Sequence, residues 1–133
     1  MIYALDSNII SYFLKKDAKI REKLAAETKA GNQFTMSTIV YFEVERWLLE
    51  ISAVKKHAEF KRMCHDVPPE EFDMDVWNTA AKLYVQMRKK GQPIDDVDLL
   101  IAAFCITNDY TLVTNNTRHF EHIDGMKFVN WKE

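Results

Sequence analysis

Short apolar runs alternate with longer segments of helical periodicity along this chain. The run "IYAL" at 2–5 has the length of a buried strand, and "SNIISYFLKK" behind it has helical spacing after a polar start. "QFTMS" at 33–37, "TLVT" at 111–114 and "KFVNW" at 127–131 are also strand-like. Strands separated by helices predict an α/β domain with a mainly parallel sheet.

Four longer segments have the periodicity of amphipathic helices, and each is bounded by a recognisable signal. Gly31 closes the first, Ser37 or Thr38 opens the second, the Pro68–Pro69 pair ends the third and Gly91 follows the fourth. These helices are predicted over 18–30, 37–51, 54–64 and 75–91. A last helix begins in the cluster "DDVD" at 95–98 and continues as an apolar run.

Composition narrows the class of protein. A chain of 133 residues with 47% hydrophobic and 29% charged residues predicts a single domain, 1–133, with one buried core. The net charge of −2 excludes a uniformly basic nucleic-acid-binding protein, so any contact with nucleic acid must come from local patches. Cys64 and Cys105 lack metal-binding spacing, which predicts reduced thiols in a cytoplasmic protein. The apolar N-terminal run is too short for a signal peptide or a membrane span.

The segment "PIDDVDLLIAAF" at 93–104 places three aspartates directly before an apolar run. If Asp95 is the N-cap, Asp98 is the third residue of the helix, where an acid can support the cap or the helix dipole. The helix that follows is apolar all round and is predicted to be buried, so a bare carboxylate beside it is costly unless it is paired or binds a metal. Asp95 and Asp96 can cap and be solvated, whereas Asp98 needs a partner.

Two further acids stand at positions of interest. Asp6 ends the first strand, and ligands of open parallel sheets bind outside the carboxyl ends of strands. An N-cap role for Asp6 is an equally good interpretation. Glu43 lies at the edge of the apolar stripe of its helix, and taken alone it is better explained by an ion pair with Arg46.

Acids near strand ends and helix starts can converge at one edge of a parallel sheet. Carboxylates packed closely raise one another's pKa unless a cation holds them ionised. A site of oxygen ligands completed by water is what Mg²⁺ or Mn²⁺ accepts, and such an ion can activate water and clamp a phosphate oxygen.

Four motifs together resemble the PIN domain, in particular the VapC toxins of bacterial and archaeal toxin–antitoxin pairs. They are "LDSN" at 5–8, "MSTIVYFEV" at 36–44, "GQPIDDVDLLIAAF" at 91–104 and "LVTNNTRHFEHIDG" at 112–125. The resemblance covers nearly the whole chain. It implies a three-layer α/β/α fold with a small, mainly parallel sheet, and a metal-dependent endoribonuclease that cleaves RNA phosphodiester bonds by metal-activated water.

The resemblance also implies the site residues. It assigns Asp6, Glu43 and Asp98 as catalytic carboxylates and ligands of Mg²⁺ or Mn²⁺. The fourth ligand position falls at Asn116, where many relatives have Asp, so Asn116 is expected to bind weakly or through water. Ser7 and Thr114 match hydroxyl positions that line the site, and Asp96 is an auxiliary acid.

The implied partners are an RNA substrate, a VapB-like antitoxin and a second copy of the chain. Apolar residues of the N-terminal helix, Ile9, Ile10 and Phe13, are candidates for the surface of that homodimer. No membrane contact is expected.

Two alternatives compete with the nuclease hypothesis. The first is a PIN-like domain that binds RNA or a protein without cleavage, although such a domain has no evident need for three clustered acids. The second is another phosphate-handling α/β domain, a receiver or a haloacid-dehalogenase-like phosphatase. "DSN" lacks the second Asp of that phosphatase motif, and "LVTNN" lacks the Lys that a receiver requires.

The histidines and the basic runs need no catalytic role to explain them. The four histidines lack a general-base pairing and are predicted to have surface or packing roles. Basic runs such as Lys15–Lys16, Lys55–Lys56 and Lys61–Arg62 are usually solvated helix faces. For a nuclease, one or two of them would line an RNA groove and contribute salt-dependent phosphate contacts.

Overall fold

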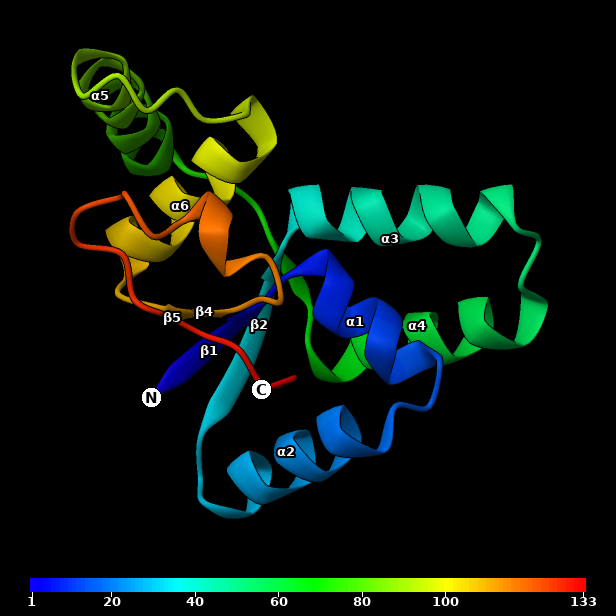
Figure 1. Ribbon diagram of the computed structural model, residues 1–133. Coiled ribbons are helices and arrows are strands. Elements are labelled where there is room, and N and C mark those ends of the chain that lie inside the picture. The colour runs from blue at the N-terminus through cyan, green and yellow to red at the C-terminus, as the bar shows by residue number, and fades with distance from the viewer.

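The computed structural model describes residues 1–133 as helices around one parallel sheet (Figure 1). The strands are β1 (Ile2–Leu5), β2 (Gln33–Ser37), β3 (Pro69–Glu70), β4 (Thr111–Val113) and β5 (Phe128–Val129). The α-helices are α1 (Ser7–Leu14), α2 (Ala18–Lys29), α3 (Thr38–Glu50), α4 (Val54–Asp66), α5 (Met74–Lys89) and α6 (Asp96–Asn108). A short 3₁₀ helix, η1 (Thr117–His119), follows β4.

The order of the strands places β1 at the centre of the sheet. The order is β3-β2-β1-β4-β5, and every neighbouring pair is parallel. The chain therefore builds outward from β1 through β2 to β3, and then returns to place β4 on the other side of β1. Ligands of open α/β sheets bind at such a reversal, outside the carboxyl ends of the strands. The predicted α/β class is confirmed, and the sheet is entirely parallel.

Polar side chains cap the starts of three helices. Ser37 caps α3 by accepting a hydrogen bond from the backbone N–H of Val40 at 3.2 Å. Asp17 and Asp73 cap α2 and α5 in the same way, each from its Oδ1 at 3.1 Å. The predicted N-cap of α3 is therefore confirmed, with Ser37 rather than Thr38 as the capping residue.

The helices form two groups with the sheet between them. One group has α1 in contact with α2, α3 and α4, and in the other α5 packs along α6. Figure 1 shows these groups on opposite sides of the sheet. The layered α/β/α arrangement places the carboxyl ends of β1 and β4 next to the starts of α1 and α3.

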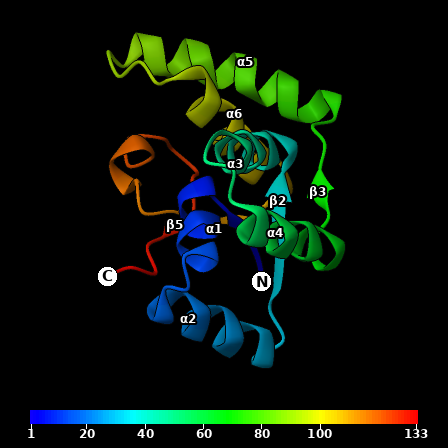
Figure 2. The same ribbon diagram turned by 90° about the vertical axis from the view of Figure 1, so that its right-hand side faces the viewer.

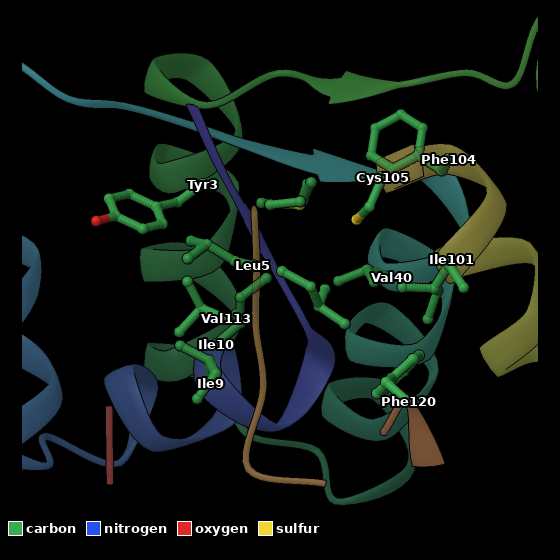
Figure 3. Packing of buried hydrophobic residues seen from close by; sticks show 14 of the residues in the cluster. Tyr3, Leu5, Ile9, Ile10, Val40, Ile101, Phe104, Cys105, Val113 and Phe120 are labelled. Carbon is green, nitrogen blue, oxygen red and sulfur yellow. The ribbon is translucent and has the colours of Figure 1, made fainter. Parts of the chain in front are cut away.

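The N-terminal helix contributes to the core rather than to the surface. Ile9 and Ile10 are 0% exposed, and Figure 3 shows them in the buried cluster with Leu5 and Val113. The expectation that Ile9 and Ile10 form a homodimer surface is therefore wrong, because helical spacing turns both side chains toward the sheet. Phe13 is only partly buried and packs against the same cluster.

Strand β3 is absent from the sequence-based prediction, which treats the Pro68–Pro69 pair only as the end of a helix. Pro69 lies opposite Met36 at the edge of the sheet, and Pro is tolerated on an edge strand because one side of that strand needs no ladder hydrogen bond. Glu70 accepts hydrogen bonds from the hydroxyls of Thr35 and Tyr110, which fixes this short strand.

The two cysteines are unpaired, as the sequence predicts. None of the helices combines the length and the apolar character that crossing a lipid bilayer requires.

Candidate active site

Asp6 lies at the centre of the site, where β1 ends and α1 begins. The residue is 4% exposed, and its Oδ1 accepts a hydrogen bond from the backbone N–H of Ser7 at 2.8 Å. Its own N–H donates to the carbonyl of Val113, which ties it to the end of β4. Burial raises the pKa of Asp6, and the nearby carboxylate of Asp98 raises it further, whereas its hydrogen bonds oppose the shift. Asp6 is thus both the N-cap and a buried acid at the sheet reversal.

Thr114, the first residue after β4, connects the polar groups around Asp6. Its hydroxyl donates to Asp6 Oδ2 at 2.7 Å and accepts from the backbone N–H of Asn116 at 3.0 Å. The amide of Asn8 lies within 3.4 Å of the same hydroxyl, and Asn8 Oδ1 accepts from the N–H of Asn115 at 3.1 Å. The predicted lining hydroxyl is therefore a buried hydrogen-bond hub that joins the carboxyl ends of β1 and β4.

Replacing Thr114 with Val tests this hub. Losing a hydrogen bond to a buried charged group costs about 1.5–3 kcal/mol, so the free energy of unfolding in EDTA at pH 7 should fall by that amount. The matched control is Thr107→Val, whose hydroxyl pairs only with the neutral hydroxyl of Thr79 at 2.9 Å. The free energy of unfolding of Thr107→Val should fall by about 0.5–1.5 kcal/mol. Urea denaturation measures both, and equal losses would contradict the charged role of the Thr114 contact.

Glu43 lines a cavity between α1 and α3. The cavity has a volume of about 290 Å³ and brings Glu43 together with Ser7 and Asn116. Burial raises the pKa of Glu43, as do the carboxylates of Asp6 and Asp98, while the Ser7 hydroxyl and Arg46 lower it. Arg46 forms no ion pair with Glu43; its guanidinium instead lies 5.0 Å from the ring centroid of Phe42. Glu43 therefore faces the candidate site as a half-buried acid, and the simple ion-pair interpretation is not supported.

Asp98 lies in the first turn of α6, and His119 is its partner. Asp95 occupies the N-cap position, but its side chain makes no capping hydrogen bond. The Asp98 carboxylate, with 20% of its side chain exposed, meets His119 Nδ1 at 2.8 Å. Burial raises the pKa of Asp98, and His119 acts in the opposite direction. The expectation that Asp98 needs a partner is correct, and a residue of η1 supplies that partner.

The remaining predicted residues lie further from this centre. Asn116 is exposed at the rim of the cavity and contacts Thr114 only through its backbone N–H. Asp96 is exposed and lines neither this cavity nor the one of about 320 Å³ that Asp95, Asp98 and His119 share. The auxiliary role of Asp96 stays a prediction.

The three carboxylates interact electrostatically, although Glu43 and Asp98 line different cavities. No three side chains of His, Cys, Asp or Glu converge closely enough to form a closed ligand cluster. The donors are nevertheless hard oxygen atoms, and each raised pKa reports unfavourable negative charge that a cation would relieve. Mg²⁺ keeps several waters and takes only one or two carboxylates directly. The donor set therefore fits Mg²⁺ or Mn²⁺ with water completing the coordination.

Comparison with known proteins decides the family. The PIN domain family model matches residues 3–126. The chain belongs to the PIN domain family. Within the family it is similar to ribonuclease VapC2 of Rickettsia felis, with 30% identity over 98% of each chain. It is also similar to ribonuclease VapC1 of Haemophilus influenzae, with 28% identity over 98% of each chain.

A solved structure agrees with this assignment. The crystal structure of VapBC2 from Rickettsia felis, bound to a DNA fragment from the promoter, contains a chain that matches this PIN domain with a TM-score of 0.90 and 27% identity. The match covers 98% of this chain and 99% of that one. The predicted membership among VapC-type PIN proteins is therefore confirmed.

Two residues of the candidate site were not predicted from the sequence. His119 is predicted to have a surface or packing role, yet it contacts Asp98 across 21 positions of sequence. Asn8 connects Asp6, Thr114 and Asn115, and only its place two residues after Asp6 could have indicated it. No local pattern marks His119, because η1 positions it through tertiary contacts.

Proposed function

We propose that this PIN domain is a metal-dependent endoribonuclease that acts as the toxin of a type II toxin–antitoxin pair. The observation that carries the proposal is the buried carboxylate of Asp6 at the sheet reversal. Burial raises its pKa and that of Glu43; Asp98 adds to the rise at Asp6, and Asp6 and Asp98 add to the rise at Glu43. The ribonuclease names of the VapC relatives support the same activity.

Each acid has a distinct part in the proposed chemistry. Asp6, held by Ser7 and Thr114, and Asp98, positioned by His119, would hold Mg²⁺ or Mn²⁺, with Asn116 orienting a ligand water. When bound, the cation supplies a water of lowered pKa and neutralises charge on a phosphate oxygen. Glu43 lines the cavity beside Ser7 and Asn116, and burial raises its pKa, so it is suited to accept a proton from the attacking water.

We infer the same partners that the family resemblance implies. The VapBC complex to which this fold is similar supports a VapB-like antitoxin. A homodimer would use exposed apolar side chains of α3 and α5, which include Phe42, Leu49, Trp77 and Val85. Exposed large apolar side chains are typical of protein interfaces where they gather into one patch.

The activity is tested with the purified full chain, free of antitoxin, on a single-stranded RNA. Cleavage is expected with Mn²⁺ or Mg²⁺ and should stop in EDTA. Glu43→Gln should lower the rate by at least about 10²-fold, the effect of losing a positioned general base. Glu50→Gln is the matched control, because Glu50 lies exposed on the same helix and has no ion-pair partner. RNA binding without cleavage under any metal condition would favour a binding domain instead.

A further inference from the structure

A strongly basic cavity lies at the far end of α1, away from the carboxylates. It has a volume of about 470 Å³. Lys15 and Lys16 line it from the end of α1, and Lys55, Lys56 and Arg62 line it from α4. Five cations in one cavity stand out in a chain whose net charge is −2.

These cations form no ion pairs within the protein. The eight ion pairs of the chain include none of the five. Glu59 is the only acid that lines the cavity, and its carboxylate is already engaged by Arg21 at 3.2 Å. Like charges gathered without partners repel one another, so the cavity is electrostatically suited to an anionic ligand.

The backbone holds one of these lysines in an uncommon conformation. Lys16 has a φ of +64°, in the left-handed region that glycine adopts most readily. Its N–H donates to the carbonyl of Phe13, which ends α1 and turns the chain toward α2. A lysine therefore occupies a turn position where glycine would be less strained, and its side chain joins the cavity.

The basic cavity adjoins the carboxylate site along α1 and α3. The cavity of about 290 Å³ that Glu43 lines extends from Ser7 to Trp47, and Lys15 Nζ lies 5.4 Å from the ring centroid of Trp47. Ser7 and Lys15 are eight residues apart on one helix, which corresponds to about 12 Å along its axis. In Figure 1, α1 and α3 lie side by side from the site toward the start of α4, and in Figure 2 this end faces the viewer.

We propose that the basic cavity binds the phosphate backbone of the RNA substrate, beyond the bond that is cleaved at the carboxylates. The inference rests on the proposed function and names the binding surface of that same site. Acids at the reaction centre repel a polyanion, so attraction has to come from cations at a distance along the strand. Trp47, between the two cavities, presents an aromatic ring of the kind on which unpaired bases stack.

Matched charge variants test the proposal. The test variant is Lys16→Gln, Lys55→Gln and Lys56→Gln together. The control is Lys23→Gln, Lys29→Gln and Lys82→Gln, which removes the same charge from exposed lysines outside the cavity that form no ion pairs. Affinity for a fluorescein-labelled single-stranded RNA of mixed sequence is measured in EDTA, over a range of NaCl concentrations, after circular dichroism has shown equal melting temperatures.

The test variant should bind about 10-fold more weakly or worse, and the slope of log affinity against log salt should fall by about 2, or 0.7 for each lost phosphate contact. The control should stay within about 2-fold of wild type. If RNA affinity falls equally in both variants, net charge rather than this cavity accounts for the loss, and the proposal is overturned. Unchanged RNA affinity in the test variant would also overturn it. If the test variant keeps its RNA affinity but no longer binds a polyglutamate peptide, the cavity binds an acidic protein segment instead.

Cleavage kinetics separate this inference from the proposed activity. With Mn²⁺, the test variant should show a raised KM for a long RNA and an unchanged kcat, because the cavity lies away from the reacting bond. If the wild-type protein binds RNA through these lysines but does not cleave it, the proposed activity is wrong and the proposed binding surface still stands. If both variants cleave RNA with the same KM, the proposed binding surface is wrong and the proposed activity still stands.

Discussion

Asp6→Asn should lower RNA cleavage by at least about 10²–10³-fold while the fold stays intact, because it removes charge where the cation and the reacting phosphate meet. Asn is nearly the same size as Asp and is also a good N-cap, so the start of α1 is preserved. The rate of Mn²⁺-dependent cleavage and a circular dichroism spectrum measure the two effects. Asn8→Ala is an informative companion, because it changes the neighbouring hydrogen bonds without altering the charge.

The same substitution should stabilise the metal-free protein at neutral pH. Burial raises the pKa of Asp6, so its contribution to stability is fully present below the unfolded pKa of about 3.9 and is lost as pH rises through the folded pKa. At pH 7, in EDTA, Asp6→Asn should therefore melt at a higher temperature than wild type, and the difference should narrow toward pH 4. A variant that is less stable than wild type at pH 7 would show that Asp6 acts mainly as a structural cap.

Phe120→Ala should produce the largest loss of stability, about 3–5 kcal/mol, because it deletes a large side chain that is 0% exposed. Phe120 directly follows η1, and its ring lies 6.3 Å from that of His119. Figure 3 shows it in the buried cluster. The substitution should therefore also loosen the segment that carries Asn116 and His119. Urea denaturation measures the free energy of unfolding.

The control for Phe120→Ala is the same substitution at an exposed phenylalanine. Phe42 is 57% exposed on α3, so Phe42→Ala should cost less than about 1 kcal/mol. If both substitutions cost the same, Phe120 would not be the anchor of the segment after β4.

The sequence predicts most of this fold because its signals are local. The run at 2–5 matches β1, and the pattern at 33–37 matches β2. Short polar caps mark where helices begin, since a single side chain completes each cap. β3 could not be predicted in this way, because a strand of two residues with a proline is defined only by its pairing with β2.

The sequence indicates the candidate acids but not the residues that hold them in place. Asp6 and Asp98 stand out because each borders an apolar run, whereas Glu43 is assigned through the resemblance to the PIN domain. His119 carries no such mark, and neither does the hydroxyl hub of Thr114, because both depend on how β4 and η1 lie against α1 and α6. The buried position of Ile9 and Ile10 was missed for the same reason. Helical spacing shows which residues share a face, and only the tertiary structure shows what that face meets.

The pairing of β1 with β4 has a consequence for biosynthesis. Asp6 and Thr114 are joined by a hydrogen bond although 108 positions separate them in the chain. A ribosome that adds about 5–20 residues per second makes Asp6 and Glu43 seconds before it reaches β4. A nascent or prematurely terminated chain therefore carries its first acids without the strand that organises them. The candidate site is therefore assembled only after β4 and the residue that follows it have been synthesised.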